Sequence, residues 1–296
     1  MILRLMSFLF VCCLVFTAKA QPVTEKKDGA LYVKSANTAE AEELFTQYGF
    51  SQFSKINSKF PRIYFLHFPS DWKEIPESDE KNTVFIKILM PLILKVNESV
   101  LAERAEVERM FNKTENQQNL TAEEQTLLDN LAQKYDAFTR LKDEEKHKVL
   151  LKQLLLKIDA VPPSILIATA GIYSNWGMSR LATQGNSLYL RELWYEKDGL
   201  KPLDDENADY SYKTYNSLEE SIYDQILKIN SGINYTYFRD SRQKARQIDR
   251  PLYGPQVAAT LLLDSNQKNI AGMIDYTFTY YKLQNADYKP QLEDIK

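Results

Sequence analysis

The chain has 296 residues, 26% of them charged, and a formal net charge of −3. This balance gives no sign of a nucleic-acid partner or of an anionic membrane partner, because both usually select a basic surface. The length suffices for one large domain or two ordinary domains with a hydrophobic core.

The first twenty residues have the pattern of a cleavable secretory signal. Arg4 precedes an apolar run at residues 5–16, and the small-residue sequence AKA follows at 18–20. The run is too short to remain as a membrane anchor. We therefore expect residues 1–20 to be removed and the mature chain, without an integral membrane segment, to reach the periplasm or cell envelope.

Both cysteines, Cys12 and Cys13, lie in that leader. The mature chain would then hold no thiol, which excludes a disulfide framework and a cysteine nucleophile. The two histidines, His67 and His147, lie far apart without the spacing of metal ligands. We therefore predict no metal, no cofactor and no histidine-based catalytic triad.

Residues 21–158 are predicted to form a mainly helical N-terminal region. Asn37 with Glu40 has the pattern of a capping box before a short amphipathic helix. Residues 61–72 alternate enough to predict an extended segment. Apolar spacing and caps then predict three helices, from 79 to about 111, from 121 to about 135 and from 143 to 157. Pro91 is expected to kink the first of them. Residues 112–119 are predicted to form a polar loop.

A different pattern begins at residue 159. Pro162 and Pro163 suit a helix start, where the missing N–H costs nothing. The following sequence SILIATAGIY is apolar on every side, which predicts a buried central helix. Such a helix is typical of the centre of a domain.

Alternation in SLYLRELWY, residues 187–195, and again through residues 210–215 predicts a small β lobe with a turn near Gly199. Ser217 with Glu220 resembles a second capping box. The remaining pattern predicts helices at about 218–230, 236–248, 255–263 and 270–283, and a tail at 286–296. The predicted fold is mainly α with a small β lobe.

The segment PPSILIATAGIYSNWGMSRLATQGNSLY, residues 162–189, carries a specific resemblance. It resembles the signature of the bacterial glucosaminidase family, the family 73 glycoside hydrolases with an endo-β-N-acetylglucosaminidase-like domain, in particular the Bax-type members. Their pattern is P-P-S, then A-x-A-x-x-E-S-x-W-G-x-S-R, then G-N-x-L-F-G. Looser likeness extends over roughly residues 60–285. The resemblance implies a lysozyme-like glucosaminidase domain at residues 159–285.

The catalytic glutamate of the family falls on Tyr173. A tyrosine has a pKa of about 10 against about 4.3 for glutamate, and general acid catalysis is worth about 10²–10⁴-fold. The phenol can instead hydrogen-bond and stack against a sugar. The resemblance thus implies a catalytically degenerate protein that binds peptidoglycan or a related amino-sugar glycan. The residues expected in its groove are Tyr173, Trp176, Asn186, Tyr189 and Trp194.

Three alternatives stay open. An active N-acetylglucosaminidase could use a relocated carboxylate, for which the candidates are Glu192, Glu196 and Asp264; each is more simply a solvated strand charge or a helix-end residue. A protein-binding scaffold of the envelope could use the helical N-terminal half. In the third alternative, Tyr173 has no role in binding or catalysis and simply fills the volume that a lost carboxylate left.

Overall fold

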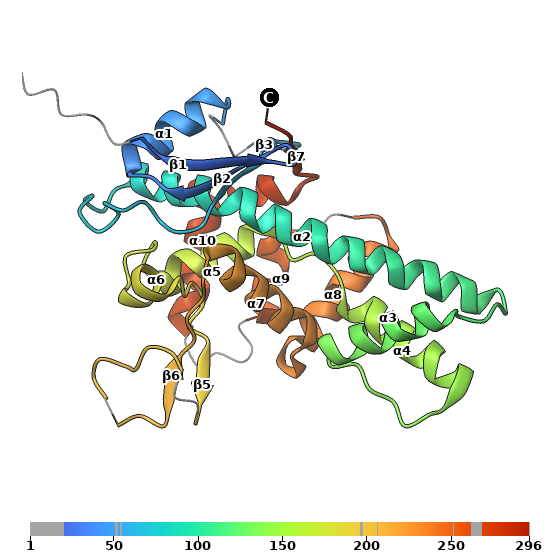
Figure 1. Ribbon diagram of the computed structural model, residues 1–296. Coiled ribbons are helices and arrows are strands. Elements are labelled where there is room, and N and C mark those ends of the chain that lie inside the picture. The colour runs from blue at the N-terminus through green and yellow to red at the C-terminus, as the bar shows by residue number, and fades with distance from the viewer. Residues whose placement is uncertain are drawn as a thin grey trace, which may run out of the picture.

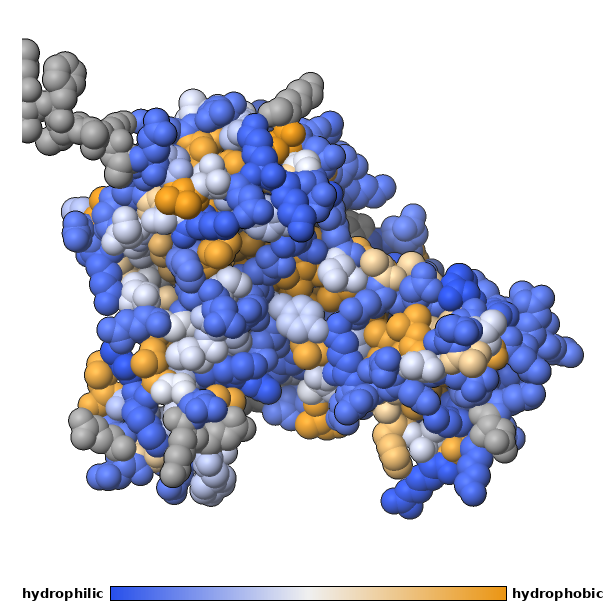
Figure 2. Space-filling model, in the orientation of Figure 1, coloured by the Kyte–Doolittle hydropathy of each residue, from blue (hydrophilic) through white to orange (hydrophobic). Residues whose placement is uncertain are grey.

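The computed structural model describes residues 21–50, 53, 55–195, 198–205, 207–250, 252–261 and 268–295. The expected leader, Glu196 and Asp264 lie outside these described residues. Helices make up most of the fold, and small sheets and a hairpin lie at its edges (Figure 1), so the prediction of a mainly α fold with a small β portion is confirmed. The visible face is mostly hydrophilic, with apolar residues showing between the hydrophilic ones (Figure 2).

The first sheet was not predicted from the sequence. Strand β1 (Val23–Lys27) pairs antiparallel with β2 (Ala30–Ser35), and β2 pairs parallel with β4 (Ile63–Phe65). Strand β3 (Lys59–Pro61) pairs parallel with β7 (Gln291–Glu293), next to the C-terminus (Figure 1). Every residue of β1 is exposed, so the alternation that reveals a half-buried strand is missing. The extended segment predicted at 61–72 is a strand only in its first part.

Helix α1 (Thr38–Gln47) begins as predicted. Asn37 Oδ1 accepts a hydrogen bond from Glu40 N at 2.9 Å, and Glu40 Oε2 accepts one from Asn37 N at 2.8 Å. The two residues therefore satisfy each other's backbone donors in a capping box, as the sequence pattern indicated.

The long helix α2 (Asp79–Glu115) runs across the molecule and packs at its far end against α3 (Ala122–Lys134) and α4 (Asp143–Lys157) (Figure 1). The loop predicted at 112–119 is wrong for its first four residues, which continue α2. The continuation places Lys113 Nζ 2.8 Å from Glu124 Oε2 on α3. Within the described ranges, no helix combines the length and apolarity that a membrane span requires.

Helix α5 (Pro163–Ser174) is buried over most of its length, as predicted. It packs against α2, α9 and α10 and lies at the centre of the molecule (Figure 1). After it come α6 (Arg180–Gly185), the hairpin strands β5 (Glu192–Trp194) and β6 (Tyr210–Tyr212), and then α7 (Leu218–Ser231), η1 (Ile233–Tyr235), α8 (Thr236–Gln247), α9 (Gly254–Leu261), α10 (Lys268–Tyr281) and η2 (Leu283–Asp287).

Two local predictions differ from the structure. The strand expected from residue 187 begins only at Glu192, because Leu190 has a φ of 50°, which interrupts the extended backbone. The second capping box is only half formed: Ser217 Oγ accepts from Glu220 N at 3.2 Å, but the Glu220 carboxylate accepts from Asn216 instead.

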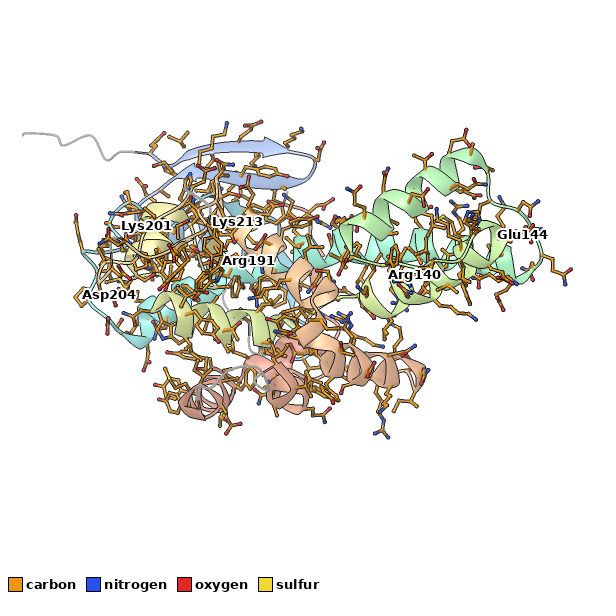
Figure 3. The ribbon with its side chains drawn as sticks, turned by 90° about the horizontal axis from the view of Figure 1, so that it is seen from below. Arg140, Glu144, Arg191, Lys201, Asp204 and Lys213 are labelled. Atoms are coloured by element: carbon orange, nitrogen blue, oxygen red, sulfur yellow. The ribbon has the colours of Figure 1, made fainter. Side chains whose placement is uncertain are left out.

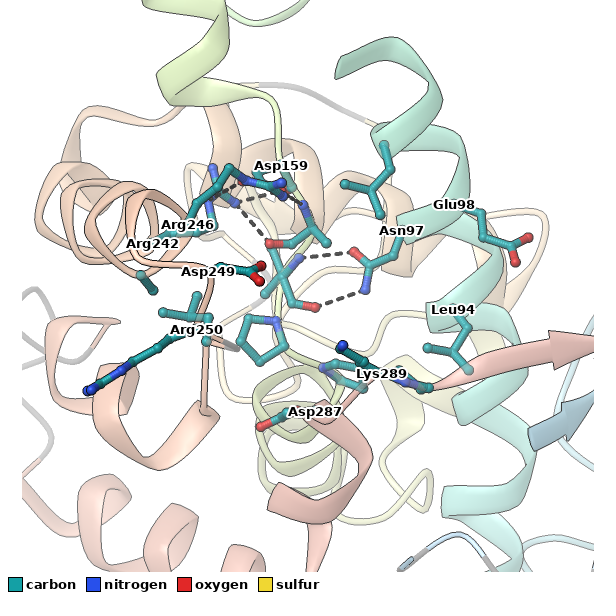
Figure 4. A pocket seen from close by; sticks show the side chains of 18 of the residues that line it. Leu94, Asn97, Glu98, Asp159, Arg242, Arg246, Asp249, Arg250, Asp287 and Lys289 are labelled. Carbon is teal, nitrogen blue, oxygen red and sulfur yellow. Dashed lines mark hydrogen bonds and ion pairs between the residues drawn. The ribbon is translucent and has the colours of Figure 1, made fainter. Parts of the chain in front are cut away.

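A buried carboxylate, Asp159, lies where the N-terminal helices meet the rest of the chain (Figure 4). Arg246 Nε donates to Asp159 Oδ2 at 2.7 Å, and Arg104 Nη1 lies 3.6 Å from the same oxygen. Burial alone would raise the pKa of Asp159, but the hydrogen bond from Arg246 and the charges of Arg242 and Arg104 lower it overall. Asp159 is therefore ionised at neutral pH.

The same arginines hold the C-terminal end of α4. Arg104 Nη1 donates to Leu155 O at 2.6 Å and to Ile158 O at 2.8 Å, and Arg242 Nη2 donates to Lys157 O at 2.8 Å. Cations are favourable at a helix C-terminus, where carbonyl groups lack intrahelical partners. The charge cluster therefore joins α2, α4 and α8 at one point.

A second buried carboxylate, Asp287, caps two helices at once. Its Oδ1 accepts from Ser164 N at 2.9 Å, and its Oδ2 accepts from Ser164 Oγ at 2.6 Å and Gly254 N at 2.8 Å. Ser164 lies in the first turn of α5 and Gly254 begins α9. Despite these donors, burial raises the pKa of Asp287 to about 6. The residues expected to form a tail at 286–296 thus include this cap and strand β7.

We expect Gly254→Ala to destabilise the fold. A Cβ at this position would lie 1.9 Å from Ser164 Oγ, whereas a Cβ at Gly272 in α10 would meet nothing within 4 Å. Gly254→Ala should lower the free energy of unfolding by about 2 kcal/mol or more. Gly272→Ala should instead raise it by up to about 1 kcal/mol. Denaturant unfolding of the two variants measures this, and equal effects would contradict the Asp287 cap.

The Asp287 cap should also depend on pH. Its folded pKa of about 6 exceeds the unfolded value of about 3.9, so its contribution to stability is fully present below about pH 4 and is lost as the pH rises through 6. Asp287→Asn cannot titrate. The unfolding free energy of the natural protein should therefore fall by about 3 kcal/mol relative to this variant between pH 4 and pH 7. A pH-independent difference would rule out the raised pKa.

Candidate glycan-binding site

The chain reverses sharply where α5 ends. Asn175, Trp176 and Gly177 have φ values of 48°, 51° and 79°, all in the left-handed region. Ser174 Oγ accepts a hydrogen bond from Gly177 N at 2.9 Å, which stabilises the turn. A Cβ at Gly177 would lie 2.8 Å from two neighbouring aromatic side chains. The serine and glycine of this motif therefore have structural roles that do not require catalysis.

Tyr173 lies in the last turn of α5, half-buried against the core. Burial raises the pKa of its phenol, so the side chain is neutral at physiological pH. A neutral phenol can donate or accept a hydrogen bond but is a weak proton donor in catalysis. The end of α5 thus presents a neutral hydroxyl on an aromatic ring.

One face of the β5–β6 hairpin is aromatic and open to solvent. Glu192 pairs with Tyr212 and Trp194 with Tyr210, so these four side chains share a face. The Trp194 and Tyr210 ring centroids lie 5.1 Å apart, and the Trp194 side chain is 55% exposed. Trp194 Nε1 donates to Glu192 Oε2 at 3.1 Å, which orients the indole. We call Glu192, Trp194, Tyr210 and Tyr212 the hairpin platform.

The platform is anchored to the body of the protein. Lys213 Nζ lies 2.7 Å from Asp224 Oδ1 on α7, and Tyr215 OH donates to Asp224 Oδ2 at 3.0 Å. Lys201 Nζ donates to Ala208 O at 2.6 Å within the hairpin loop. Lys201 and Lys213 lie together at the hairpin end of the molecule, far from the α3–α4 end (Figure 3). The exposed rings are therefore held in place by bonds on other sides of the hairpin.

Two expected groove residues serve the fold. Asn186 ends α6 with a φ of 50°, donates from Nδ2 to Tyr215 O at 2.9 Å and places Oδ1 3.2 Å from His67 Nδ1. Tyr189 is buried, and its hydroxyl donates to Leu166 O at 3.1 Å. Burial raises the pKa of Tyr189 well above its usual range. Tyr189 thus has no open face for a ligand.

Trp176 lies away from the hairpin platform, among the residues around α10. Its ring packs edge-on against Phe85 with centroids 5.4 Å apart and lies 5.3 Å from the Tyr281 centroid. Its carbonyl accepts from Trp72 Nε1 at 3.1 Å. Trp176 lines a pocket between α2, α5 and α10. Among the described residues that line this pocket, none belongs to the hairpin.

The structure therefore brings Glu192 and Trp194 together and separates Trp176 from them. Tyr210 and Tyr212 were not predicted as site residues, although their period-two spacing placed them on one strand face. Glu196 and Asp264, the other candidates for a relocated acid, lie outside the described residues. In the part of the chain that the structure describes, no group of three or more His, Cys, Asp or Glu side chains is placed to hold a metal ion.

Protein Bax of Escherichia coli (strain K12) is 24% identical to this chain over 193 residues. The chain is a distant relative of protein Bax. The match covers 65% of this chain and 65% of the length of protein Bax. No family model and no solved structure matches. The relationship agrees with the Bax-type resemblance of residues 162–189.

We expect Tyr189→Phe to show that the buried hydroxyl stabilises the fold. The variant loses the buried hydrogen bond to Leu166 O, which should lower the free energy of unfolding by about 1 kcal/mol. Denaturant unfolding measures the loss, and a variant as stable as the natural protein would contradict a stabilising role of this bond.

Proposed function

We propose that this chain is an exported protein that binds peptidoglycan or a related amino-sugar glycan without hydrolysing it. The glucosaminidase-like motif of residues 162–189 supports the choice of ligand, and the similarity to protein Bax agrees with the Bax-type form of that motif. The observation that carries the proposal is the half-buried, neutral Tyr173 at the end of α5. The motif resemblance assigns the family's acid to this position.

Loss of the acid removes the proton transfer that glycoside cleavage requires. Glycosidases of the common mechanism use one protonated carboxyl group to release the leaving-group oxygen and a second carboxylate on the sugar's other side. Of the candidate replacements, Glu192 is exposed and hydrogen-bonded to Trp194. It therefore lies in open solvent and not in the partly desolvated position that a catalytic general acid occupies.

The hairpin platform supplies what sugar binding needs. The apolar C–H face of a sugar ring stacks on an aromatic side chain, and planar polar groups bind its hydroxyls. Trp194 and Tyr210 offer adjoining ring surfaces, and the Glu192 carboxylate has acceptor sites beyond the one used by Trp194. A repeating polymer can engage such an open surface without a closed cavity.

Export is part of the proposal and rests on the sequence of residues 1–20. An amino-sugar cell-wall polymer lies outside the cytoplasmic membrane, so a protein that binds it must cross that membrane. Fractionation of cells that produce the full chain should place the shortened protein in the envelope, and a cytoplasmic protein of full length would contradict export.

Trp194→Ala should weaken binding to purified peptidoglycan by about tenfold, equivalent to about 1.4 kcal/mol. Phe138→Ala is the matched control, since Phe138 is 71% exposed and lies between α3 and α4, away from the hairpin. Co-sedimentation across a range of polymer concentrations measures both affinities. Equal binding by the two variants would remove the platform from the site.

Replacement of the phenol by an acid tests the absence of hydrolysis. The natural protein should release no reducing ends from peptidoglycan, whereas Tyr173→Glu should release them if the groove is otherwise intact. Tyr173→Gln is the control, because glutamine is similar in size to glutamate but has no acidic group. Release by the natural protein, abolished by Glu192→Gln, would instead establish an active enzyme with a relocated carboxylate.

A further inference from the structure

A pocket of about 760 Å³ lies between the first turn of α2, the end of α5 and α10. The side chains that give it its chemistry are those of Asp79, Asn82, Trp176, Tyr276 and Tyr281. Its volume is in the range of cavities that bind small ligands. The hairpin platform lies outside it.

The polar side of the pocket is a connected hydrogen-bond network. Tyr280 OH and Tyr281 OH donate to the two oxygens of the Asp79 carboxylate, the second at 3.0 Å. Asn82 Nδ2 donates to Tyr281 OH at 3.0 Å. The pKa of Tyr281 is raised to about 12, chiefly by burial, so its hydroxyl keeps its proton. These bonds fix the positions of an acceptor carboxylate and a side-chain amide before a ligand arrives.

The other side of the pocket is aromatic. The rings of Trp176 and Tyr281 lie 5.3 Å apart between centroids, and Tyr276 stacks on Tyr280 with centroids 5.4 Å apart. Tyr276 is 63% exposed, so much of its ring surface is open. Gly272 adds no side chain, and a Cβ there would meet nothing within 4 Å, which leaves space along α10.

The combination favours a neutral, hydroxyl-rich ring. No Lys or Arg belongs to the described lining, which disfavours a phosphate or another anion. A carboxylate has about four lone-pair sites and an amide has two donors, so Asp79 and Asn82 retain capacity for ligand hydroxyls. The aromatic rings suit the apolar face of the same ligand.

We propose that this pocket binds one sugar ring, independently of the hairpin platform. The ring stacks on Tyr276 against the wall formed by Trp176 and Tyr281, and its hydroxyls bond to Asp79 and Asn82. The choice of an amino sugar as the ring rests on the proposed function. The pocket then holds a short or terminal saccharide, while the platform holds extended polymer.

Isothermal titration with the disaccharide of N-acetylglucosamine tests the pocket on the full-length protein. Tyr276→Ala and Asn82→Ala should each weaken binding by about tenfold. Tyr237→Ala is the matched control, because Tyr237 is 67% exposed on α8 and does not line the pocket.

Two results would overturn the proposal in distinguishable ways. If the natural protein is retained on peptidoglycan but does not bind the disaccharide, or binds it equally well in the Tyr276 and Asn82 variants, the pocket is not a sugar site and the proposed function stands. If neither polymer nor disaccharide binds, both fail. Thermal melting of each variant confirms that it is folded.

Discussion

The buried charge of Asp159 determines how the N-terminal helices meet the central helix. Arg104 reaches it from α2, and Arg242 and Arg246 reach it from α8. Loss of one partner from a buried ion pair typically costs about 3–5 kcal/mol, because the remaining charge is uncompensated. Val161 lies two residues after Asp159. Its backbone N–H donates to the Asn97 side chain on α2, and its carbonyl accepts a hydrogen bond from the same side chain. The start of α5, and hence the position at which Tyr173 emerges, is fixed by these contacts.

Much of the helical fold could be predicted because its signals are local. The caps at Asn37 and Thr121 act on adjacent backbone groups, as do Pro162 before α5 and Pro163 at its first position. Each of these helices begins where these residues indicate. Strand β1 gave no such signal because all its residues are exposed. Strand β1 is held in place by its pairing with β2. The pairing of β2 with β4 joins segments that lie farther apart in the sequence than β1 and β2 do, so no local pattern indicates it.

The candidate site was only partly predictable for the same reason. The motif located the end of α5, but the left-handed turn directs Trp176 towards α10 and away from the hairpin. The link between Asp79 and Tyr280 joins residues 201 positions apart. No pattern within one helix indicates such a contact. Tyr189 is buried because of its neighbours in space, which the sequence around it does not reveal.

Several residues of segment 162–189 have structural roles that do not require catalysis. Ser164 bonds to Asp287, Ser174 and Gly177 form the turn after α5, and Asn186 ends α6. Each of these contacts stabilises the fold. A match at these positions therefore agrees with a shared fold and does not by itself establish activity.

The chain's three tryptophans allow one direct test of glycan binding. Trp194 is on the platform, Trp176 lines the α10 pocket, and Trp72 is buried with its indole N–H bonded to Trp176 O. The indole N–H signals in a ¹H–¹⁵N NMR spectrum should be followed as a soluble peptidoglycan fragment is added. We expect the Trp194 and Trp176 signals to shift in a saturable manner, and more than that of Trp72. No saturable shift of either signal would contradict glycan binding by this protein.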